Sequence, residues 1–415
     1  MRVLHVAGTT LGGAGRGLMG LHKGLLDLGI DSAVLSLGAR QSASTMATVR
    51  VPPVRYLMTK SAVRLDRLIL GALNGRPKET FHTPWIPTPV TSLIRDVNPD
   101  ILHLHWLGNT ITAKQLGALS SDFPTVWTMR DLAPVTGGCH YSHGCNNFVG
   151  HCGTCPLLPR PSKRDATYWT HKAKLNALDV QNIEPIALSR WQASEIERSR
   201  LFRSRRVTVI NPGVDTSVFT PAEREISRSE LGLPSNQHLV GFVATHPFTD
   251  VRKGAHLLAE ANRILREQGI DVWVVATATR EEVTRALATR SDSWIPLGRT
   301  ADDHKLSALY SACDVIAVPS TQEAFGKVAI EALACGVPVV AFAETGVADA
   351  VDHLFTGFLA KHGDVRDLSF GLGWALESEN VASSPNAIRR VAVDRFGLME
   401  QATSYADLYR SILHR

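Results

Sequence analysis

Short apolar runs rich in β-branched residues alternate along the chain with longer segments whose apolar residues recur at helical spacing. The first run is Arg2–Ala7, and five glycines follow within Gly8–Gly17. Leu18–Leu28 then has the spacing of a helix, and Asp31–Leu37 is the next strand-like run. A strand, a helix and a second strand in this order predict a parallel sheet with helices on its faces.

The same rhythm stops at a junction in the middle of the chain and then restarts. The junction, Asn211–Asp215, holds the turn-forming pair Pro-Gly. Strand-like runs lie on both sides of it, at Ile101–His105, Thr125–Met129, Ile183–Leu188, Val207–Ile210, Leu239–Ala244, Asp271–Ala276, Ser293–Pro296, Asp314–Val318 and Val337–Ala341. We therefore expect an α/β protein with an N-terminal domain at residues 1–206, a second domain at 207–390 and an amphipathic helical tail at 391–415.

The composition is that of an ordinary globular protein, with 44% hydrophobic and 20% charged residues. A formal net charge of +5 is too small to indicate nucleic acid, so no nucleic-acid partner is expected. No apolar run approaches the ~20 residues that cross a bilayer, and the N-terminus lacks the pattern of a signal peptide. We therefore expect a cytoplasmic protein.

Two stretches combine basic residues with apolar or aromatic ones, Arg55–Leu73 and Arg160–Lys174. Either is suited to a peripheral contact with anionic lipid at the inner face of the membrane. The alternative is an ordinary amphipathic helix with a solvated basic face.

The segment Val318–Glu331 carries the clearest chemical signal. A buried strand ends, a short polar loop follows, and a helix should begin near Gly326. Glu323 then stands before the helix, and Glu331 lies about one turn inside it. A helix N-terminus presents free backbone N–H groups that favour an anion such as a diphosphate, here those of Ala324, Phe325, Gly326 and Lys327. Taken singly, Glu323 also fits an ordinary N-terminal helix charge, and Glu331 a solvated residue.

Five motifs stand in the order typical of one known family. They are Gly12-Gly13-Ala14-Gly15, Asn211–Asp215, Arg252-Lys253-Gly254, the pair Glu323 and Glu331, and Glu344-Thr345-Gly346-Val347. This ordered set closely resembles the large retaining glycosyltransferase family 4.

The resemblance implies the GT-B fold, in which two Rossmann-like, doubly wound domains face one another across a cleft. The C-terminal tail would cross back to the N-terminal domain. The implied reaction transfers a sugar from a nucleotide-diphosphate sugar to an acceptor with retention of configuration. No catalytic metal is expected, because the fold needs no Mg²⁺ for the diphosphate and no convincing Asp-x-Asp loop occurs.

The resemblance also assigns site residues. Lys253 is the expected point charge on the leaving diphosphate, with a solvated lysine as the alternative, while Glu323 would contact donor hydroxyls and Glu331 the ribose. The donor-binding set comprises Gly12, Gly13, Arg252, Lys253, Glu323, Ala324, Phe325, Gly326, Lys327 and Glu331, and the catalytic set Asp131, Lys253 and Glu323. The chain departs from the family at Arg130, which stands where many members have the His of a His-Asp pair. Three roles are open to Arg130: binding acceptor, binding phosphate, or pairing with Asp131.

Four of the six cysteines fall within seventeen residues, at Cys139, Cys145, Cys152 and Cys155. This density favours a structural Zn²⁺ site, with His140, His143 and His151 as alternative ligands; two disulfides or four free thiols are the other interpretations. The pattern of the Cys-rich insert, residues 136–158, resembles that of colanic-acid-type polysaccharide transferases. That likeness implies polysaccharide biosynthesis with a saccharide or lipid-linked saccharide acceptor.

Other functions fit parts of these observations. A GT-B nucleotide-sugar epimerase or a phosphorylase would share the fold. A non-catalytic module that binds zinc or nucleic acid would account for the cysteines, but it leaves the segment with Glu323 and Glu331 without a purpose. The ordered motifs favour the transferase.

Overall fold

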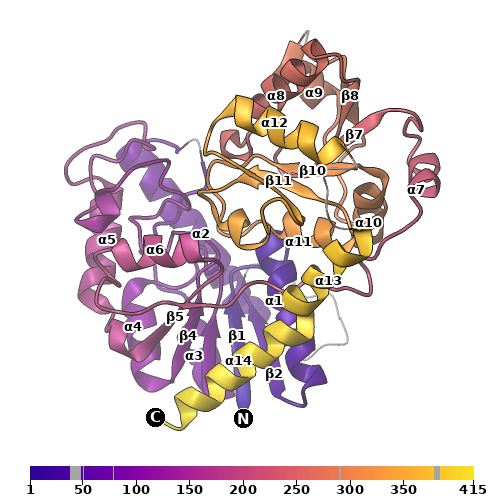
Figure 1. Ribbon diagram of the computed structural model, residues 1–415. Coiled ribbons are helices and arrows are strands. Elements are labelled where there is room, and N and C mark those ends of the chain that lie inside the picture. The colour runs from indigo at the N-terminus through magenta and orange to yellow at the C-terminus, as the bar shows by residue number, and fades with distance from the viewer. Residues whose placement is uncertain (38–47, 50, 78, 289–290, 378–383) are drawn as a thin grey trace. The chain divides into compact units, whose positions relative to one another are not determined.

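The computed structural model describes residues 1–37, 48–49, 51–77, 79–288, 291–377 and 384–415, which form two compact units. Unit 1 comprises Met1–Asn211 together with Gln401–Arg415, and unit 2 comprises Pro212–Glu400 (Figure 1). Each unit holds one sheet of six parallel strands with helices beside it, so the expected α/β fold class is confirmed. Among the helices of the described residues, none combines the length and the apolar character needed to span a bilayer.

The sheet of unit 1 has the strand order β2-β1-β3-β4-β5-β6. Its strands are β1 (Arg2–Ala7), β2 (Asp31–Ser36), β3 (Ile101–Leu104), β4 (Thr125–Thr128), β5 (Ile183–Ala187) and β6 (Thr208–Val209). Its helices are α1 (Gly12–Asp27), α2 (Pro53–Asn74), α3 (Val90–Val97), α4 (Ala113–Asp122), α5 (Ala166–Ala177), α6 (Arg190–Arg198) and α14 (Leu398–Leu413), with 3₁₀ turns η1 (Asn147–Val149) and η2 (Val180–Asn182). Since β1, β3 and β4 are parallel neighbours, the loops after them leave the same edge of the sheet.

The sheet of unit 2 has the order β12-β11-β10-β7-β8-β9. Its strands are β7 (His238–Phe242), β8 (Val272–Ala276), β9 (Trp294–Pro296), β10 (Val315–Val318), β11 (Val339–Phe342) and β12 (Gly357–Ala360). Its helices are α7 (Arg224–Glu230), α8 (Ala255–Glu267), α9 (Arg280–Leu287), α10 (Asp303–Ala312), α11 (Lys327–Ala334), α12 (Val365–Leu376) and α13 (Pro385–Phe396), with 3₁₀ turns η3 (Val251–Lys253) and η5 (Gly346–Asp349). Here β11, β10 and β7 are the parallel neighbours whose following loops share one edge.

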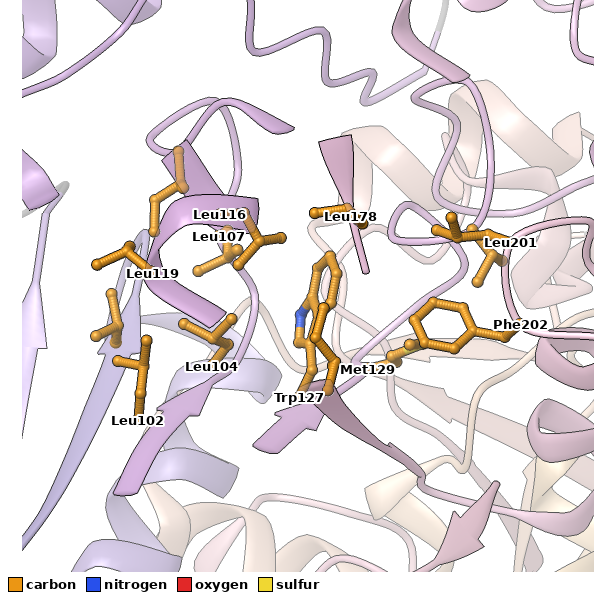
Figure 2. Packing of buried hydrophobic residues seen from close by; sticks show 14 of the residues in the cluster. Leu102, Leu104, Leu107, Leu116, Leu119, Trp127, Met129, Leu178, Leu201 and Phe202 are labelled. Atoms are coloured by element: carbon orange, nitrogen blue, oxygen red, sulfur yellow. The ribbon is translucent and has the colours of Figure 1, made fainter. Parts of the chain in front are cut away.

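Trp127 on β4 lies at the centre of the main apolar cluster of unit 1. Figure 2 shows its indole between Leu104 on β3 and Met129, which follows β4, with Phe202 beyond Met129. The indole N–H donates to the backbone carbonyl of His105 at 3.3 Å, so the polar atom of the buried ring is satisfied. Strands buried on both faces read as continuous apolar runs, which explains why the sequence indicated them so clearly.

Helix α14, yellow in Figure 1, packs on the sheet of unit 1. Its Tyr405 and Tyr409 are fully buried in a cluster that includes Val3 of β1. Both hydroxyl groups are satisfied. The Tyr409 hydroxyl lies 2.6 Å from Nδ1 of His103, and the Tyr405 hydroxyl lies 2.7 Å from Oγ1 of Thr128. Apolar burial and hydrogen bonds together hold the end of the chain on this sheet.

The helix expected at Leu18–Leu28 begins six residues earlier than predicted, because α1 starts at Gly12 within the glycine-rich segment. Gly12 has φ +72°, a conformation that favours glycine. Gly15 packs so tightly that a Cβ there would lie 2.0 Å from the carbonyl carbon of Thr10. The glycines therefore allow the chain to turn tightly into α1. The spacing of hydrophobic residues does not show where such a turn ends and the helix begins.

The tail expected as one helix from Val391 consists of two helices, α13 and α14, which are separated at Gly397. The N–H of Val214 donates to the carbonyl of Phe396 at 2.7 Å, and a β-bridge joins Val214 to Gly397. The break is thus set by pairing with a distant segment of the same unit.

Replacing Tyr409 by Ala is expected to destabilise unit 1 by about 3–5 kcal/mol, the usual cost of removing a buried aromatic side chain. The matched control is Leu413→Ala on the same helix, because Leu413 is 42% exposed and its loss should change stability by at most about 0.5 kcal/mol. Urea denaturation followed by tryptophan fluorescence compares the two variants. Equal unfolding midpoints would contradict the role of α14 in the core.

Candidate functional site

The expected donor loop lies in unit 2, between the end of β10 and the start of α11. Gly326 caps α11 with φ +82°, and a Cβ there would lie 2.8 Å from Cγ2 of Val347, so both the backbone and the space require glycine. The backbone N–H groups of the first turn, which begins at Lys327, lie at the positive end of the helix dipole. Such a terminus suits an anion.

Lys253 and Glu323 meet at this loop. The Lys253 ammonium lies 2.5 Å from Oε2 of Glu323, although the two residues are 70 positions apart in the sequence. Gly254, with φ +74°, permits the close approach, because a Cβ there would lie 2.0 Å from the carbonyl oxygen of Pro319. The predicted cation and carboxylate are therefore neighbours, which excludes a fully solvated Lys253.

Arg252 joins the same two loops. Its guanidinium donates to the carbonyl of Gln322 at 2.8 Å and lies 2.5 Å from the Asp250 carboxylate, while its own carbonyl accepts from the N–H of Thr321 at 2.8 Å. These contacts give Arg252 a structural role. Its part in donor binding stays a prediction.

The late glycine turn packs on the same segment. The N–H of Gly346 donates to the carbonyl of Glu323 at 2.9 Å, and a Cβ on Gly346 would lie 2.2 Å from the carbonyl oxygen of Ala324. Ala324 and Phe325 have buried side chains, so only their backbone is suited to a polar ligand. Loops after β7, β10 and β11 thus meet at Glu323.

Glu331 is 1% exposed, so the interpretation as a solvated residue is wrong. The Tyr310 hydroxyl donates to its Oε2 at 2.8 Å, and Nζ of Lys327 lies 3.9 Å from its Oε1. A carboxylate has about four acceptor positions, so this one retains capacity for the hydroxyl groups of a ligand.

Unit 1 has a pocket at the edge where β3 and β4 end. It is lined by His82, Pro84, His105, Trp106, Leu107, Gly108, Ile111, Ala113, Leu116, Trp127, Arg130, Asp131, Ala133, Pro134 and Lys174. Asp131 Oδ2 lies 2.5 Å from Nδ1 of His140, and Oδ1 accepts from the N–H of Ala133 at 2.8 Å. Burial alone would raise the pKa of Asp131, but the His140 ring and the Ala133 N–H hold this pKa below its ordinary value. Asp131 therefore pairs with His140 and not with Arg130.

Arg130 lines this pocket with its side chain partly buried, and it has no carboxylate partner among the described residues. One guanidinium nitrogen lies 3.2 Å from Nδ1 of His105, while its Nε makes no hydrogen bond. Gly17 leaves the necessary room, since a Cβ there would lie 2.8 Å from Nη1 of Arg130. Burial lowers the pKa of Arg130, because an enclosed cation without a counter-ion is unfavourable. A bound anion would relieve this cost.

The predicted site residues fall into both units. Gly12 and Gly13 open α1 in unit 1, where a Cβ on either would meet no heavy atom within 4 Å, and Asp131 lies in the same unit. Unit 2 brings together the remaining ones: Arg252, Lys253, Glu323, Ala324, Phe325, Gly326, Lys327 and Glu331.

The four clustered cysteines line one small pocket of unit 1 as free thiols: Cys139, Cys145, Cys152 and Cys155. Burial raises the pKa of Cys139 and of Cys152 to about 12. The histidines named as alternative ligands are engaged elsewhere: His140 with Asp131, His143 with Glu79 and His151 with Arg200. The thiols are therefore the better donor set for a metal.

A group of three buried histidines escaped the sequence analysis. The ring nitrogens of His5, His103 and His105 lie within 4.8 Å of one another. In the described part of the chain, no other three His, Cys, Asp or Glu side chains bring their ligand atoms this close together. His5 and His103 are register partners on β1 and β3, and alternate histidines in the run Ile101–His105 were the available signal. Burial lowers the pKa of His5 to about 3, and Arg130 beside His105 disfavours a further cation. These three rings are therefore suited to stay neutral and to pack behind Arg130.

Two sequence families match the chain. The family described as "Glycosyltransferase Family 4" matches residues 11–218, and "Glycosyl transferases group 1" matches residues 223–392.

Several relatives are named D-inositol 3-phosphate glycosyltransferase. That of Xylanimonas cellulosilytica is 30% identical over 328 residues, which cover 76% of this chain and 73% of the relative. That of Thermobispora bispora is 33% identical over 223 residues, and this match spans about half of its length, 51%. Across 43% to 73% of their length, four such relatives are 30% to 35% identical to this chain.

Among solved structures, Anabaena HepE in complex with UDP and glucose superposes with a TM-score of 0.64 at 20% identity, over 99% of this chain and 100% of that one. This likeness shows the fold, which is GT-B as expected. The family model covers half of the sequence, and the order of motifs and the two parallel sheets agree with it. The chain therefore belongs to glycosyltransferase family 4.

Proposed function

We propose that this protein transfers a sugar from a nucleotide-diphosphate sugar to a hydroxyl group of a phosphate-bearing acceptor, either an inositol phosphate or a lipid-linked saccharide. The observation that carries the proposal is the convergence of Lys253, Glu323 and the N-terminus of α11 in one loop cluster. As the bond to the sugar breaks, negative charge develops on the diphosphate, and a cation with oriented N–H groups stabilises it. HepE, with the same fold, binds UDP.

The acceptor side of the proposal rests on Arg130. A partly buried guanidinium at the wall of a pocket, without a carboxylate partner among the described residues, suits a phosphate group. The indole of Trp106 also lines this pocket and offers an apolar face to a sugar ring. Two acceptors carry phosphate: D-inositol 3-phosphate, after which the relatives are named, and a saccharide linked to lipid through diphosphate.

Helix α2 favours a lipid-linked acceptor. Its exposed residues include an apolar set, Val54, Leu57, Met58, Leu65, Leu68 and Leu73, whereas Thr59, Ala62, Asp66, Leu70 and Asn74 face inward. Exposed basic residues lie beside this apolar set, at Lys60, Arg64 and Arg67. The one acidic residue of the helix, Asp66, is buried and accepts from the N–H groups of Trp85 and Ile86. An apolar stripe with basic flanks suits an anionic bilayer surface.

The second basic stretch is less suited to a membrane. Lys174 is buried and donates to the carbonyls of Ala133 and Thr136, and Arg160 donates to the carbonyls of Gly71 and Ala72. We therefore place the proposed peripheral contact, at the inner face of the membrane, on α2.

Retention, the role in polysaccharide biosynthesis and the likeness to colanic-acid-type transferases stay predictions. The relatives are named after an inositol phosphate acceptor. The activity test therefore includes both an inositol phosphate and a lipid-linked saccharide. The anomeric configuration of the product, measured by NMR, decides retention. Turnover of the donor without any acceptor would instead favour the epimerase.

The donor role is tested with Lys253→Ala against Lys305→Ala, an exposed lysine on α10. Thermal shifts with UDP-, GDP- and dTDP-sugars first identify the donor, since a bound ligand raises the melting temperature. Transfer is then measured to D-inositol 3-phosphate, to free inositol and to a lipid-diphosphate-linked saccharide. Lys253→Ala should lower kcat/KM by about a hundredfold or more, because the diphosphate loses its cation. Wild-type turnover by Lys253→Ala would remove Lys253 from this role, and equal use of free inositol would remove the phosphate requirement.

We further propose that the four clustered cysteines hold one structural Zn²⁺, tetrahedrally and without an open position. The donor set fits, although the sulfur atoms do not form a group within 4.8 Å, so a bound ion would draw them closer. Zinc would cross-link the insert and supply no chemistry to the reaction.

Elemental analysis of protein purified without added metal should find close to one zinc per chain, and Cys152→Ser should lose it while Cys335→Ala in unit 2 retains it. The thiol pKa values near 12 mean that zinc must displace protons, so its affinity should fall as the pH is lowered. Metal-free protein with full activity and stability would refute the zinc site.

The membrane contact is tested by co-sedimentation with vesicles of phosphatidylglycerol and of phosphatidylcholine. Binding should favour the anionic vesicles, weaken as salt is raised, and fall at least tenfold in the double variant Leu57→Asp/Leu68→Asp, because charged residues cannot enter the apolar layer. Ile226→Asp/Phe370→Asp, at exposed apolar positions of unit 2, is the matched control. Equal binding by both double variants would contradict a role of α2.

A further inference from the structure

The two carboxylate oxygens of Glu331 on α11 have different surroundings. The Tyr310 hydroxyl donates to Oε2 at 2.8 Å, whereas Oε1 accepts no hydrogen bond from a described residue. Nζ of Lys327 lies 3.9 Å from Oε1, which is beyond hydrogen-bond distance. Although Glu331 is almost fully buried, Oε1 is not one of the enclosed polar atoms that lack a partner. One oxygen is therefore fixed, and the other is open to a ligand.

The geometry of α11 directs this open oxygen toward the N-terminus of the helix. Side chains of an α-helix tilt toward its N-terminus, and Glu331 accordingly lies near Lys327, the first residue of α11. The same N-terminus is suited to the diphosphate of a donor. In a nucleoside diphosphate the ribose is bonded directly to the diphosphate and carries hydroxyl groups at positions 2′ and 3′. The open oxygen is thus suited to accept hydrogen bonds from these hydroxyl groups.

Tyr310 comes from the neighbouring helix α10 and is held rigidly. Its side chain is fully buried, and its ring packs against that of Phe219 with centroids 6.0 Å apart. One turn earlier on α10, the Ser307 hydroxyl lies 3.5 Å from Sγ of Cys335, which is one turn beyond Glu331 on α11. Two contacts at helical spacing therefore fix α10 against α11, and the phenol oxygen in turn fixes the Glu331 carboxylate.

Stability alone does not explain the pair of Tyr310 and Glu331. A buried carboxylate is unfavourable unless its oxygens are hydrogen-bonded, and here a neutral phenol serves only one of them. In unit 1, by contrast, both oxygens of the buried Asp131 have partners. An apolar side chain in place of Glu331 would avoid the cost of burying a charge. The unpaired oxygen is therefore suited to a ligand that brings hydroxyl donors.

We propose that Tyr310 is a positioning residue through which the protein selects ribonucleoside diphosphate sugars and rejects their 2′-deoxy counterparts, dTDP-sugars included. The inference rests on the proposed sugar transfer and on the contact of Glu331 with the ribose. Because Tyr310 holds Oε2, the carboxylate keeps one orientation, in which it accepts from both the 2′ and the 3′ hydroxyl group. A deoxyribose lacks one of these donors and leaves the buried carboxylate short of a hydrogen bond. A site built to bind a substrate hydroxyl group rejects the analogue that lacks it.

Tyr310→Phe removes the phenol oxygen and keeps the packing of the ring. Oε2 of Glu331 then loses its donor, and the carboxylate can turn away from the orientation that suits two hydroxyl groups. The 2′ hydroxyl group should therefore contribute much less to binding in this variant. A purely structural role of Tyr310 would instead weaken the binding of ribonucleotides and deoxyribonucleotides equally.

The test measures nucleotide binding by isothermal titration calorimetry and needs neither acceptor nor turnover. UDP, GDP and ADP are each compared with their 2′-deoxy counterparts, so the base is matched within each pair. The ribose preference is the Kd of the deoxyribonucleotide divided by that of the ribonucleotide. For the base that binds, it should be about tenfold or more in the wild type, because a buried acceptor left unsatisfied is costly. In Tyr310→Phe it should approach one, mainly through weaker binding of the ribonucleotide.

Two further variants separate positioning from packing. Ser307→Ala removes another hydroxyl group between α10 and α11 and should keep the wild-type ribose preference. Glu331→Gln preserves the shape of the side chain and should lose most of the preference. Adding Tyr310→Phe to Glu331→Gln should then change the preference little, because the two residues act as one unit. Circular dichroism establishes that each variant is folded.

The outcomes separate the role of Tyr310 from the proposed function. A ribose preference near one in the wild type, or an equal weakening of both nucleotides in Tyr310→Phe, would overturn the inference. If Tyr310→Phe does not fold, an unchanged preference in Glu331→Gln overturns it instead. A wild type that binds no nucleoside diphosphate would overturn the proposed function. Absence of transfer to every acceptor, with the ribose preference present and lost in Tyr310→Phe, would overturn the proposed function alone.

Discussion

Parallel strand pairing is the constraint on which both candidate sites depend. In a parallel sheet all carboxyl ends lie at one edge, so loops far apart in the sequence must leave the sheet side by side. In unit 2 this brings the loops after β7, β10 and β11 together, and Gly254 and Gly346 then allow backbone contacts that a Cβ would prevent. The ion pair of Lys253 with Glu323 is a consequence of that packing.

Two adjacent charged residues of unit 1, Arg130 and Asp131, differ in their partners. Asp131 has partners for both carboxylate oxygens and stays ionised. Arg130, the next residue, faces neutral His105 and has no carboxylate partner in the described residues. A fully paired charge stabilises a fixed arrangement, whereas a charge without a counter-ion is stabilised by a ligand. The same short loop thus holds one group suited to structure and one suited to binding.

The end of the chain supports this loop from behind. Tyr409 of α14 contacts His103, and Tyr405 contacts Thr128, the last residue of β4 before Met129 and Arg130. His103 and His105 lie on the same edge, and His105 contacts Arg130. The contacts that anchor α14 and those that place Arg130 therefore form one hydrogen-bonded network. Buried histidine, threonine and tyrosine side chains are tolerated there because they are hydrogen-bonded to one another.

The sequence by itself determined the β–α rhythm and the two parallel sheets, because these depend on local spacing. Its short motifs also predicted a junction near Asn211 and a donor-binding set of Lys253, Glu323 and Glu331, whose roles stay predictions. The sequence left the partner of Asp131 open and missed the three buried histidines His5, His103 and His105. The break at Gly397 was also beyond it. These features are decided by contacts between segments distant along the chain, such as the bridge of Phe81 with Cys139, and no local pattern of hydrophobic residues encodes such contacts.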